Sequence, residues 1–301
     1  MIAKLIEGAP LAAQIRDDVA RDVQALRLQG RAVRLACIQV GEKAESVLYA
    51  RNQHRVCVDV GMEFSVAQLP ATASQAELLQ KIEELNAARD VHGMILQLPL
   101  PPSLDAFAAQ RAMDPNKDVE GAHPLNLGLL ICGQIQRVPC TAMAAYQLIK
   151  STGISLKGLE CVIVGRSQIV GKPLALMLIR DHCTVTVCHT STRDLTAHTR
   201  NADLLIAAAG RPALIKAEMV KPGAMVIDVG TNRVRVLDAH GQPALNEKGK
   251  PAFKTVGDVD TEPVKTVAEW ITPVPGGVGP VTVMILLRNV VEAANSLSKK
   301  S

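Results

Sequence analysis

Apolar and polar positions follow two different periods along the first third of the chain. Continuous, largely apolar runs end at Gly or Pro, which is typical of strands buried on both faces. Between these runs, apolar residues recur every three or four positions, which predicts helices. Ser74 followed three residues later by Glu77 has the pattern of a capping box. The predicted strands are residues 34–40, 63–69 and 92–98, and the predicted helices are residues 9–29, 44–60 and 75–88.

The same alternation returns in the second half of the chain. Between the halves, residues 103–142 are rich in turn residues and predict loops and short helices. Residues 233–255 are polar with several Gly and Pro, which predicts an exposed hairpin or loop. The predicted strands here are 160–164, 184–188, 203–209 and 225–229. The predicted helices are 143–151, one that follows the G-R-S-Q-I-V-G-K-P string and ends at about residue 180, and 281–297. The pattern therefore predicts an α/β protein with two parallel-sheet domains, the second one Rossmann-like.

Composition limits the classes of protein that fit this pattern. The 301 residues hold 33 Lys and Arg against 29 Asp and Glu, with only 2% aromatic residues. Because the positive charges are scattered and stacking side chains are few, neither nucleic acid nor a membrane surface is an expected partner. No apolar run is long enough for a membrane span, and the first residues do not resemble a signal peptide.

Cysteine usage indicates the compartment. The seven cysteines are an odd number and include no C-x-x-C pair, which argues against a disulfide framework and against structural zinc. We therefore expect a reduced, cytoplasmic protein without a bound metal.

A strand–turn–helix after residue 160 has the chemistry of a dinucleotide site. Gly165 ends the strand and Gly171 opens the helix, so a phosphate can approach the backbone and the positive helix N-terminus. The spacing is not G-x-G-x-x-G, and an ordinary tight turn is the alternative interpretation.

The next strand favours NADP over NAD. It ends at Cys188 without the carboxylate that bonds the ribose of NAD. Arg166, assisted by the hydroxyl of Thr190 or Ser191, suits a 2′-phosphate, because a guanidinium can bond two phosphate oxygens. The alternative is that Arg166 is a solvated loop residue.

Polar side chains gather at the predicted carboxyl ends of the first-domain strands, where ligands bind in open parallel sheets. Tyr49 and Gln53 are four residues apart on the predicted helix 44–60 and share one face. Gln97 ends the third strand. Taken singly, each could be a packing or surface residue, but together they predict a polar cleft for a heterocycle. The following loop adds Lys117, Asp118 and Glu120.

Taken together, these motifs resemble the methylenetetrahydrofolate dehydrogenase/cyclohydrolase family. They occur in the family's order and cover nearly the whole chain. The matching strings are V-G-x4-S-x2-Y at 40–49, G-M-I-L-Q-L-P-L-P at 93–101, K-D-V-E-G at 117–121, P-C-T at 139–141, V-G-R-S-x-I-V-G-K-P at 164–173, I-D-V-G-x-N at 227–232, V-G-D-V at 256–259 and T-P-V-P-G-G-V-G-P-x-T at 272–282.

The resemblance implies oxidation of 5,10-methylenetetrahydrofolate by hydride transfer to NADP⁺, followed in many members by hydrolysis to 10-formyltetrahydrofolate at the same site. It also implies a homodimer whose protomers have an active-site cleft between two domains. The expected folate-binding catalytic domain is residues 1–142 plus 272–301, and the expected NADP-binding domain is residues 143–271.

The resemblance also assigns residues. Tyr49 would stack on the folate ring, Glu120 stands where an Asp holds the pterin, and Thr231 stands where an apolar residue often faces the nicotinamide. The implied catalytic residues are Tyr49, Gln53, Gln97 and Glu120. The implied substrate-binding residues are Tyr49, Asp118, Glu120, Pro275, Gly276 and Gly277. The implied cofactor-binding residues are Gly165, Arg166, Ser167, Ile169, Thr190, Ser191, Gly210 and Thr231.

The sequence departs from the family pattern on the folate side. The family has Y-x3-K, whose lysine is the main catalytic group, but this chain has Gln53 at that position. Arg51 and His54 are close in sequence, yet they point about 100–200° away on a helix. The other departures are Glu120 for Asp, Ala122 for a bulky residue and Ala142 for Pro.

These changes predict a dehydrogenase with weak or absent cyclohydrolase activity. Hydride transfer is mainly a positioning task, whereas hydrolysis needs proton transfer, which an amide cannot provide. One alternative is a full bifunctional enzyme in which His54, Glu120 or a water replaces the lysine. Another is a folate- or NADP-binding protein without catalysis.

Overall fold

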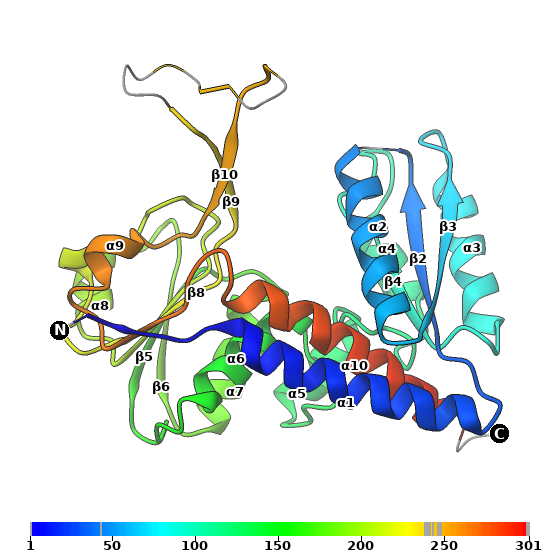
Figure 1. Cartoon of the computed structure of the whole chain (residues 1–301), viewed down its shortest axis with the longest axis horizontal. Coiled ribbons are helices and arrows are strands. Elements are labelled where there is room, and N and C mark those ends of the chain that lie inside the picture. Colours follow the sequence, from blue (N-terminus) through cyan, green and yellow to red (C-terminus); the bar gives the residue numbers. More distant parts are fainter. Residues whose placement is uncertain (1, 43, 238–241, 243, 246–248, 299–301) are drawn as a thin grey trace. The chain divides into compact units, whose positions relative to one another are not determined.

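The computed structural model describes residues 2–42, 44–237, 242, 244–245 and 249–298; for residues 44–49 and 298 it describes the backbone alone. The chain divides into two compact units (Figure 1). Unit 1 comprises residues 1–11 and 141–281, and unit 2 comprises residues 12–140 and 282–301. The chain therefore begins in unit 1, crosses to unit 2, returns and ends in unit 2.

Unit 2 is built on a parallel three-stranded sheet in the order β3-β2-β4. Alternate residues of β2 face opposite sides: Ala36 and Ile38 pack on Leu78 and Ile82 of α3, whereas α2 packs against β2 and β3. The Ser74 capping box that opens α3 is present as predicted. Its elements are β2 (Arg34–Val40), α2 (Ala44–Asp59), β3 (Glu63–Leu69), α3 (Gln75–Ala87), β4 (Gly93–Leu96), α4 (Ala106–Ala112) and α5 (Pro124–Ile131).

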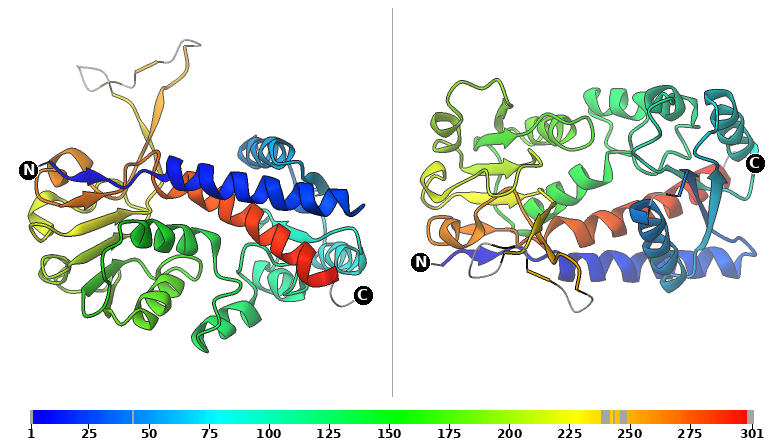
Figure 2. Two further views of the ribbon diagram at one scale, coloured as in Figure 1. Left: turned by 60° about the horizontal axis from the view of Figure 1, so that its bottom comes forward. Right: turned by 90° about the horizontal axis from the view of Figure 1, so that it is seen from above.

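Unit 1 contains a parallel six-stranded sheet in the order β1-β11-β8-β7-β5-β6. Its core is aliphatic, with Val162, Leu205 and Val226 from three neighbouring strands nearly inaccessible. The antiparallel hairpin β9–β10 projects from this sheet (Figure 2). Its elements are β1 (Lys4–Leu5), β5 (Glu160–Val164), α7 (Gly171–Arg180), β6 (Thr184–Cys188), α8 (Leu195–Thr199), β7 (Leu204–Ala207), the 3-10 helix η1 (Ala217–Met219), β8 (Met225–Asp228), β9 (Asn232–Arg235), β10 (Phe253–Val256), α9 (Thr261–Val264) and β11 (Trp270–Ile271).

Three helices contain the boundaries between the units: α1 (Gly8–Leu28), α6 (Cys140–Ser151) and α10 (Val278–Ser298). The expected domain limits differ from this division at the chain ends. Residues 1–11 and 272–281 belong to unit 1, because β1 pairs with β11 and β11 pairs with β8. Strand pairing between β1, β11 and β8 therefore assigns these segments to unit 1, although they are far apart in sequence.

Most predicted elements have the expected bounds, and the differences have local causes. The strand expected at 92–98 is only Gly93–Leu96, since Pro99 restricts the residue before it and offers no N–H. The strand expected at 203–209 is Leu204–Ala207. The last helix starts at Val278 rather than 281. The hairpin or loop expected at 233–255 is β9 and β10, while residues 238–241, 243 and 246–248 lie outside the described part.

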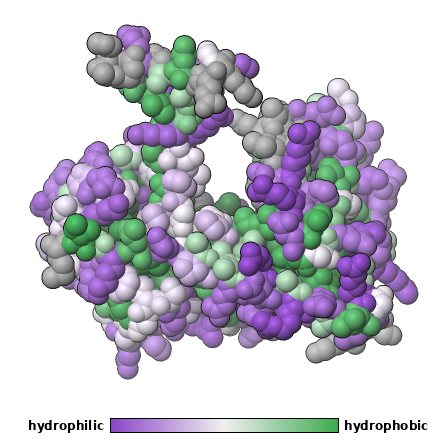
Figure 3. Space-filling model, in the orientation of Figure 1, coloured by the Kyte–Doolittle hydropathy of each residue, from purple (hydrophilic) through white to green (hydrophobic). Residues whose placement is uncertain are grey.

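The surface agrees with the balanced composition. On the face in Figure 3, hydrophilic residues predominate and apolar residues form small separate groups. Within the described residues, no helix combines the length and apolarity that crossing a membrane requires.

Candidate active site

All predicted cofactor residues lie at one edge of the unit 1 sheet. Because the strands are parallel, the loops that follow them emerge at their shared carboxyl edge. These loops carry Gly165 to Ile169 after β5, Thr190 and Ser191 after β6, Gly210 after β7 and Thr231 after β8. The structure thus brings together the residues that the sequence assigned to NADP.

The turn after β5 is a cradle of bare backbone. In the sheet, β6 lies on one side of β5 and β7 on the other, so the strand order reverses at β5. Gly165 has φ +130°, and a Cβ added to it would lie 2.1 Å from the carbonyl oxygen of Ala208 after β7. A Cβ on Gly171 would lie 2.0 Å from the Gly165 oxygen. Only glycine fits these positions, and the side-chain-free turn at a topological switch point suits a dinucleotide phosphate.

The side chains beside this turn remain accessible. Arg166, Ser167 and Ile169 are exposed, and within the described part of the chain Arg166 forms no ion pair. The Ser167 hydroxyl accepts a hydrogen bond from the Val170 N–H at 3.1 Å, which orders the turn just before α7. No side chain caps the first turn of α7 among the described residues. An exposed guanidinium beside an uncapped helix start fits a phosphate ligand.

The Pro275–Gly277 loop belongs to unit 1, although the sequence placed it in the folate domain. It follows β11, and the Gly8 N–H donates a hydrogen bond to the Gly276 carbonyl oxygen at 2.8 Å. A Cβ on Gly8 would lie 1.9 Å from the Gly277 oxygen. The segment is thus fixed by close backbone packing at the same sheet edge as the cofactor loops.

Unit 2 gathers a second cluster on the α2 side of its sheet. Gln53 is only 3% exposed and shares a face of α2 with Cys57, one turn further on. The Cys37 thiol of β2 donates a weak hydrogen bond to Gln97 Oε1 at 3.9 Å. Burial raises the pKa of both Cys37 and Cys57 to about 12. Both thiols are therefore protonated, and the Cys37 contact directs the Gln97 oxygen inward.

Glu120 joins this cluster because its segment runs along the free edge of β4. The Met94 N–H donates to the Lys117 carbonyl oxygen at 2.7 Å, and Met94 pairs with Asp118 as an isolated bridge. The Glu120 side chain is partly exposed, yet burial of its carboxyl group and the nearby Asp118 raise its pKa to about 8, against a stabilising backbone hydrogen bond from Leu96. Glu120 is thus a titratable group bonded to the Leu96 backbone, next in sequence to Gln97, and its charge changes near pH 8.

Asp118 has an internal partner for both carboxylate oxygens. Oδ1 accepts the Gly121 N–H at 3.1 Å, and Oδ2 accepts the His123 N–H and the Asn126 side-chain amide at 2.8 Å each. Asp118 is 3% exposed. The Asp118 carboxylate therefore orders the backbone of the loop that follows Glu120.

Of the two further candidates from the sequence, Tyr49 and His54, the structure describes only the His54 side chain. The Tyr49 side chain lies outside the described part, although its backbone belongs to α2. His54 is exposed and its ring contacts Phe64 of β3, with centroids 5.8 Å apart, so it lies away from the buried face that carries Gln53.

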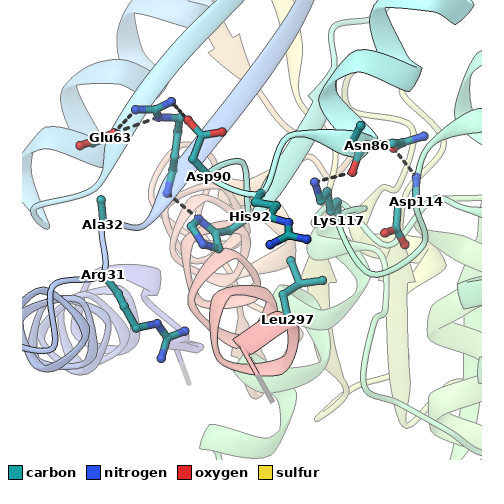
Figure 4. Close-up of a pocket in the computed structure, with 12 residues that line it drawn as sticks. Arg31, Ala32, Glu63, Asn86, Asp90, His92, Asp114, Lys117 and Leu297 are labelled. Atoms are coloured by element: carbon teal, nitrogen blue, oxygen red, sulfur yellow. Dashed lines mark hydrogen bonds and ion pairs between the residues drawn. The ribbon is translucent and has the colours of Figure 1, made fainter. Parts of the chain in front are cut away.

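A pocket of about 920 Å³ in unit 2 lies at the opposite sheet edge (Figure 4). Arg34 and Glu63 begin β2 and β3, and His92 precedes β4, so this pocket is at the amino ends of the strands. Arg34 pairs with both Glu63 and Asp90. Of the residues that the sequence placed in the predicted cleft, Lys117 lines this pocket, whereas Gln53, Gln97 and Glu120 do not. This pocket therefore lies at the amino ends of the strands, whereas the sequence predicts the substrate cleft at their carboxyl ends.

Sequence reasoning missed two buried carboxylates of unit 1. Asp228 and Asp258 are 1% and 0% exposed and follow or face the end of β8. Their strings, at 227–232 and 256–259, were noticed only as family motifs. The available signal was an Asp within two residues of a Gly in both strings. Within the described residues, no group of three or more His, Cys, Asp or Glu side chains could hold a metal ion.

Comparisons with known proteins show the family of the chain. Residues 6–120 match the family described as "Tetrahydrofolate dehydrogenase/cyclohydrolase, catalytic domain", and residues 139–298 match its "NAD(P)-binding domain". "Bifunctional protein FolD" of Moorella thermoacetica is 47% identical over 98% of this chain and 99% of its own length.

Solved structures give the same result. The bifunctional FolD enzyme of Campylobacter jejuni is 39% identical with a TM-score of 0.88, covering 98% of this chain and 99% of that one. The Trypanosoma brucei FolD, solved with NADP cofactor and an inhibitor, is 34% identical with a TM-score of 0.89 and full coverage of both chains.

Proposed function

Since the chain belongs to the tetrahydrofolate dehydrogenase/cyclohydrolase family, we propose that it oxidises 5,10-methylenetetrahydrofolate to 5,10-methenyltetrahydrofolate with NADP⁺, and that its cyclohydrolase activity is weak or absent. The family membership rests on matches over nearly the whole chain. The restriction to one activity rests on a single observation, the buried Gln53 on the active face of α2.

Each part of the cofactor and the substrate is assigned to residues of suitable chemistry. Gly165 and Gly171 allow the close backbone packing of the turn at the start of α7, where the pyrophosphate would bind, and the exposed Arg166 supplies a guanidinium for the 2′-phosphate. The nicotinamide, when bound, supplies the hydride-accepting carbon. Gln53, Gln97 and Glu120 bind and orient the folate, and Asp118 and Lys117 fix the Glu120 segment from behind.

Removal of the family lysine affects the two reactions unequally. Hydride transfer needs the methylene carbon held close to the acceptor, which neutral amides can do. Hydrolysis of the methenyl cation needs a group that takes and returns a proton, a contribution of roughly 10²–10⁴ in rate. Glutamine does not titrate, so hydrolysis loses this contribution and hydride transfer keeps most of its positioning.

Two assays on one purified sample test the proposal. NADPH formation from methylenetetrahydrofolate measures the dehydrogenase, and decay of methenyltetrahydrofolate measures the hydrolase. We expect NADPH formation, decay at the spontaneous rate, and accelerated decay in Gln53→Lys. Gln80→Lys, on the exposed face of α3, adds the same charge elsewhere and should leave decay unchanged.

Each contrary result has a distinct meaning. Enzyme-accelerated decay in the natural protein would refute the restriction to one activity. Tight binding of folate and NADP⁺ without NADPH would indicate a binding protein that has lost catalysis.

A full bifunctional enzyme is the second candidate, and Glu120 favours it. Its raised pKa, to about 8, makes it a group that could exchange protons near neutral pH beside Gln97. In that case decay would be accelerated in the natural protein and would return to the spontaneous rate in Glu120→Gln. His54 is the weaker substitute, since its exposed ring lies against Phe64.

Assembly and location complete the proposal. The family resemblance supports a homodimer, which sedimentation equilibrium would test. A cytoplasmic location, suggested by cysteine usage, would be tested by cell fractionation.

A further inference from the structure

Two buried carboxylates meet beyond the carboxyl end of β8, where the I-D-V-G-x-N and V-G-D-V strings dock on each other. Asp228 Oδ1 accepts the N–H groups of Gly230 and Asp258, and Oδ2 accepts the Val259 N–H, each at 2.9 Å. Burial raises the pKa of Asp228 to about 6 despite these bonds. Asp228 thereby ties residues 257–259 to the turn that leads to Thr231.

Asp258 makes the return connection to the cofactor loops. Its Oδ2 accepts the N–H groups of Ala209 and Gly210 at 2.6 and 2.8 Å. Its Oδ1 accepts the side-chain amide of Asn232 at 2.8 Å. One carboxylate thus holds the loop after β7 and the residue next to Thr231 at a fixed separation.

The glycines of both strings are explained by this arrangement. A Cβ on Gly230 would lie 2.3 Å from Oδ1 of Asp258, and a Cβ on Gly257 would lie 1.8 Å from Oδ2 of Asp228. Neither position has the left-handed backbone that would otherwise require glycine. These glycines therefore leave space for the two carboxylates.

No basic side chain compensates this charge. Within the residues that the structure describes, neither Asp228 nor Asp258 forms an ion pair with Lys or Arg. Burying a carboxylate without a cation is costly, and here backbone N–H groups and the Asn232 side-chain amide compensate it. Such a costly pair is typical of a place where loop geometry matters for function.

We propose that Asp258 is a positioning residue that fixes the Ala209–Gly210 loop against the Thr231–Asn232 turn and so sets where the nicotinamide end of NADP lies. This inference rests on the proposed function, in which Gly210 and Thr231 contact the cofactor. The adenosine end is assigned to the loops after β5 and β6, whereas the Asp258 carboxylate bonds Ala209, Gly210 and Asn232. Asp258 should therefore control the reacting half of the cofactor more than its anchoring half.

The test compares Asp258→Asn with Asp260→Asn. An amide has one oxygen in place of two, so at least one of the three contacts becomes a clash between donors. Asp260 is two residues away and pairs with Lys216 at 2.9 Å near the surface, which makes it a matched control. Asn232→Ala is a milder second variant, because it removes one donor and leaves the contacts to Ala209 and Gly210.

Four quantities are measured on each protein: thermal unfolding, the affinities for 2′,5′-ADP and for NADPH, single-turnover NADPH formation, and backbone hydrogen exchange at residues 209–210. In Asp258→Asn we expect 2′,5′-ADP affinity within about twofold of the natural protein and hydride transfer slower by roughly 10²-fold, since small misplacements have such effects. Exchange at 209–210 should rise. Asn232→Ala should lie between, and Asp260→Asn should match the natural protein.

Two results would overturn the proposal. One is an equal loss of 2′,5′-ADP affinity and hydride transfer, which is the signature of a purely structural residue. The other is unchanged hydride transfer in both Asp258→Asn and Asn232→Ala. If the natural protein forms no NADPH from methylenetetrahydrofolate, the proposed function fails. The ratio of NADPH to 2′,5′-ADP affinity and the exchange at 209–210 still decide the role of Asp258.

Discussion

The Lys117 ammonium lies 2.7 Å from the carbonyl oxygen of Ala88, at the end of α3. It also donates to the carbonyl oxygens of Leu85 and Asn86, so one buried cation satisfies three carbonyls at a helix C-terminus. The Lys117 backbone in turn accepts the Met94 N–H of β4. Lys117 therefore connects α3 to the strand edge along which Glu120 lies.

Lys117→Met should lower the free energy of unfolding by about 2–4 kcal/mol, because the variant leaves three partly buried carbonyls without their charged donor. Urea denaturation measures the change. Lys81→Met is the control: Lys81 pairs with Glu84 on the surface of α3, and its loss should cost less than about 1 kcal/mol. Equal effects of the two substitutions would show that the helix-end contacts contribute nothing.

Glu120 should make hydride transfer depend on pH. Its pKa is raised to about 8, so the group is protonated below that pH and carries its negative charge above it. Oxidation places positive charge on the substrate, which a nearby carboxylate stabilises. Single-turnover NADPH formation should therefore rise about tenfold or more as the pH increases through 8.

Two variants check this assignment. Glu120→Gln should give a flat profile, and Gln53→Lys should move the midpoint to lower pH, because a cation nearby favours the carboxylate. A midpoint that persists in Glu120→Gln would assign the titration to another group.

Arg166 should determine the preference for NADP⁺. Arg166→Gln should reduce the ratio of kcat/KM for NADP⁺ over NAD⁺ by roughly 10–100-fold, the value of losing one charged hydrogen-bonding group. Steady-state kinetics with both cofactors measure the ratio. Arg180→Gln, at the exposed C-terminal end of α7, which follows the Arg166 turn, removes an equal charge and should leave the ratio unchanged.

Gly165 should tolerate no side chain. Gly165→Ala introduces a Cβ about 2.1 Å from a backbone oxygen at φ +130°, where only glycine is comfortable. We expect a loss of more than about 2 kcal/mol in stability together with loss of NADPH binding, seen by thermal unfolding and cofactor fluorescence. Gly128→Ala in α5 meets nothing within 4 Å and should stabilise by about 0.5–1 kcal/mol.

The long elements of the fold were predictable because each carries its own signal. The strands at 34–40, 63–69, 160–164 and 184–188 have the expected bounds, since each run ends at a residue that stops a strand or at a helix signal. The two-residue strands β1 and β11 were not predicted. Two residues show no period, and their pairing joins Lys4 to Trp270, which no local pattern can reveal.

The sequence allowed the location of the candidate site residues to be predicted, but not the hydrogen-bond partners of each one. The sequence put the cofactor residues on loops that share one sheet edge, and the structure has them there. It could not foresee that Asp118 bonds Gly121, His123 and Asn126, since these partners depend on how the loop folds back. For the same reason Asp258 was missed: its partners are backbone N–H groups almost fifty residues away.

The pairing of β1 with β11 has a consequence for synthesis of the chain. Lys4 and Leu5 leave the ribosome long before their partners Trp270 and Ile271, which lie far along the chain. Closing so long a loop is slow and entropically costly. β1 must therefore stay unpaired while the residues before β11 are synthesised. The six-stranded sheet is completed only once β11 has emerged from the ribosome. Until then, β1 exposes unpaired backbone N–H and C=O groups to which a chaperone can bind.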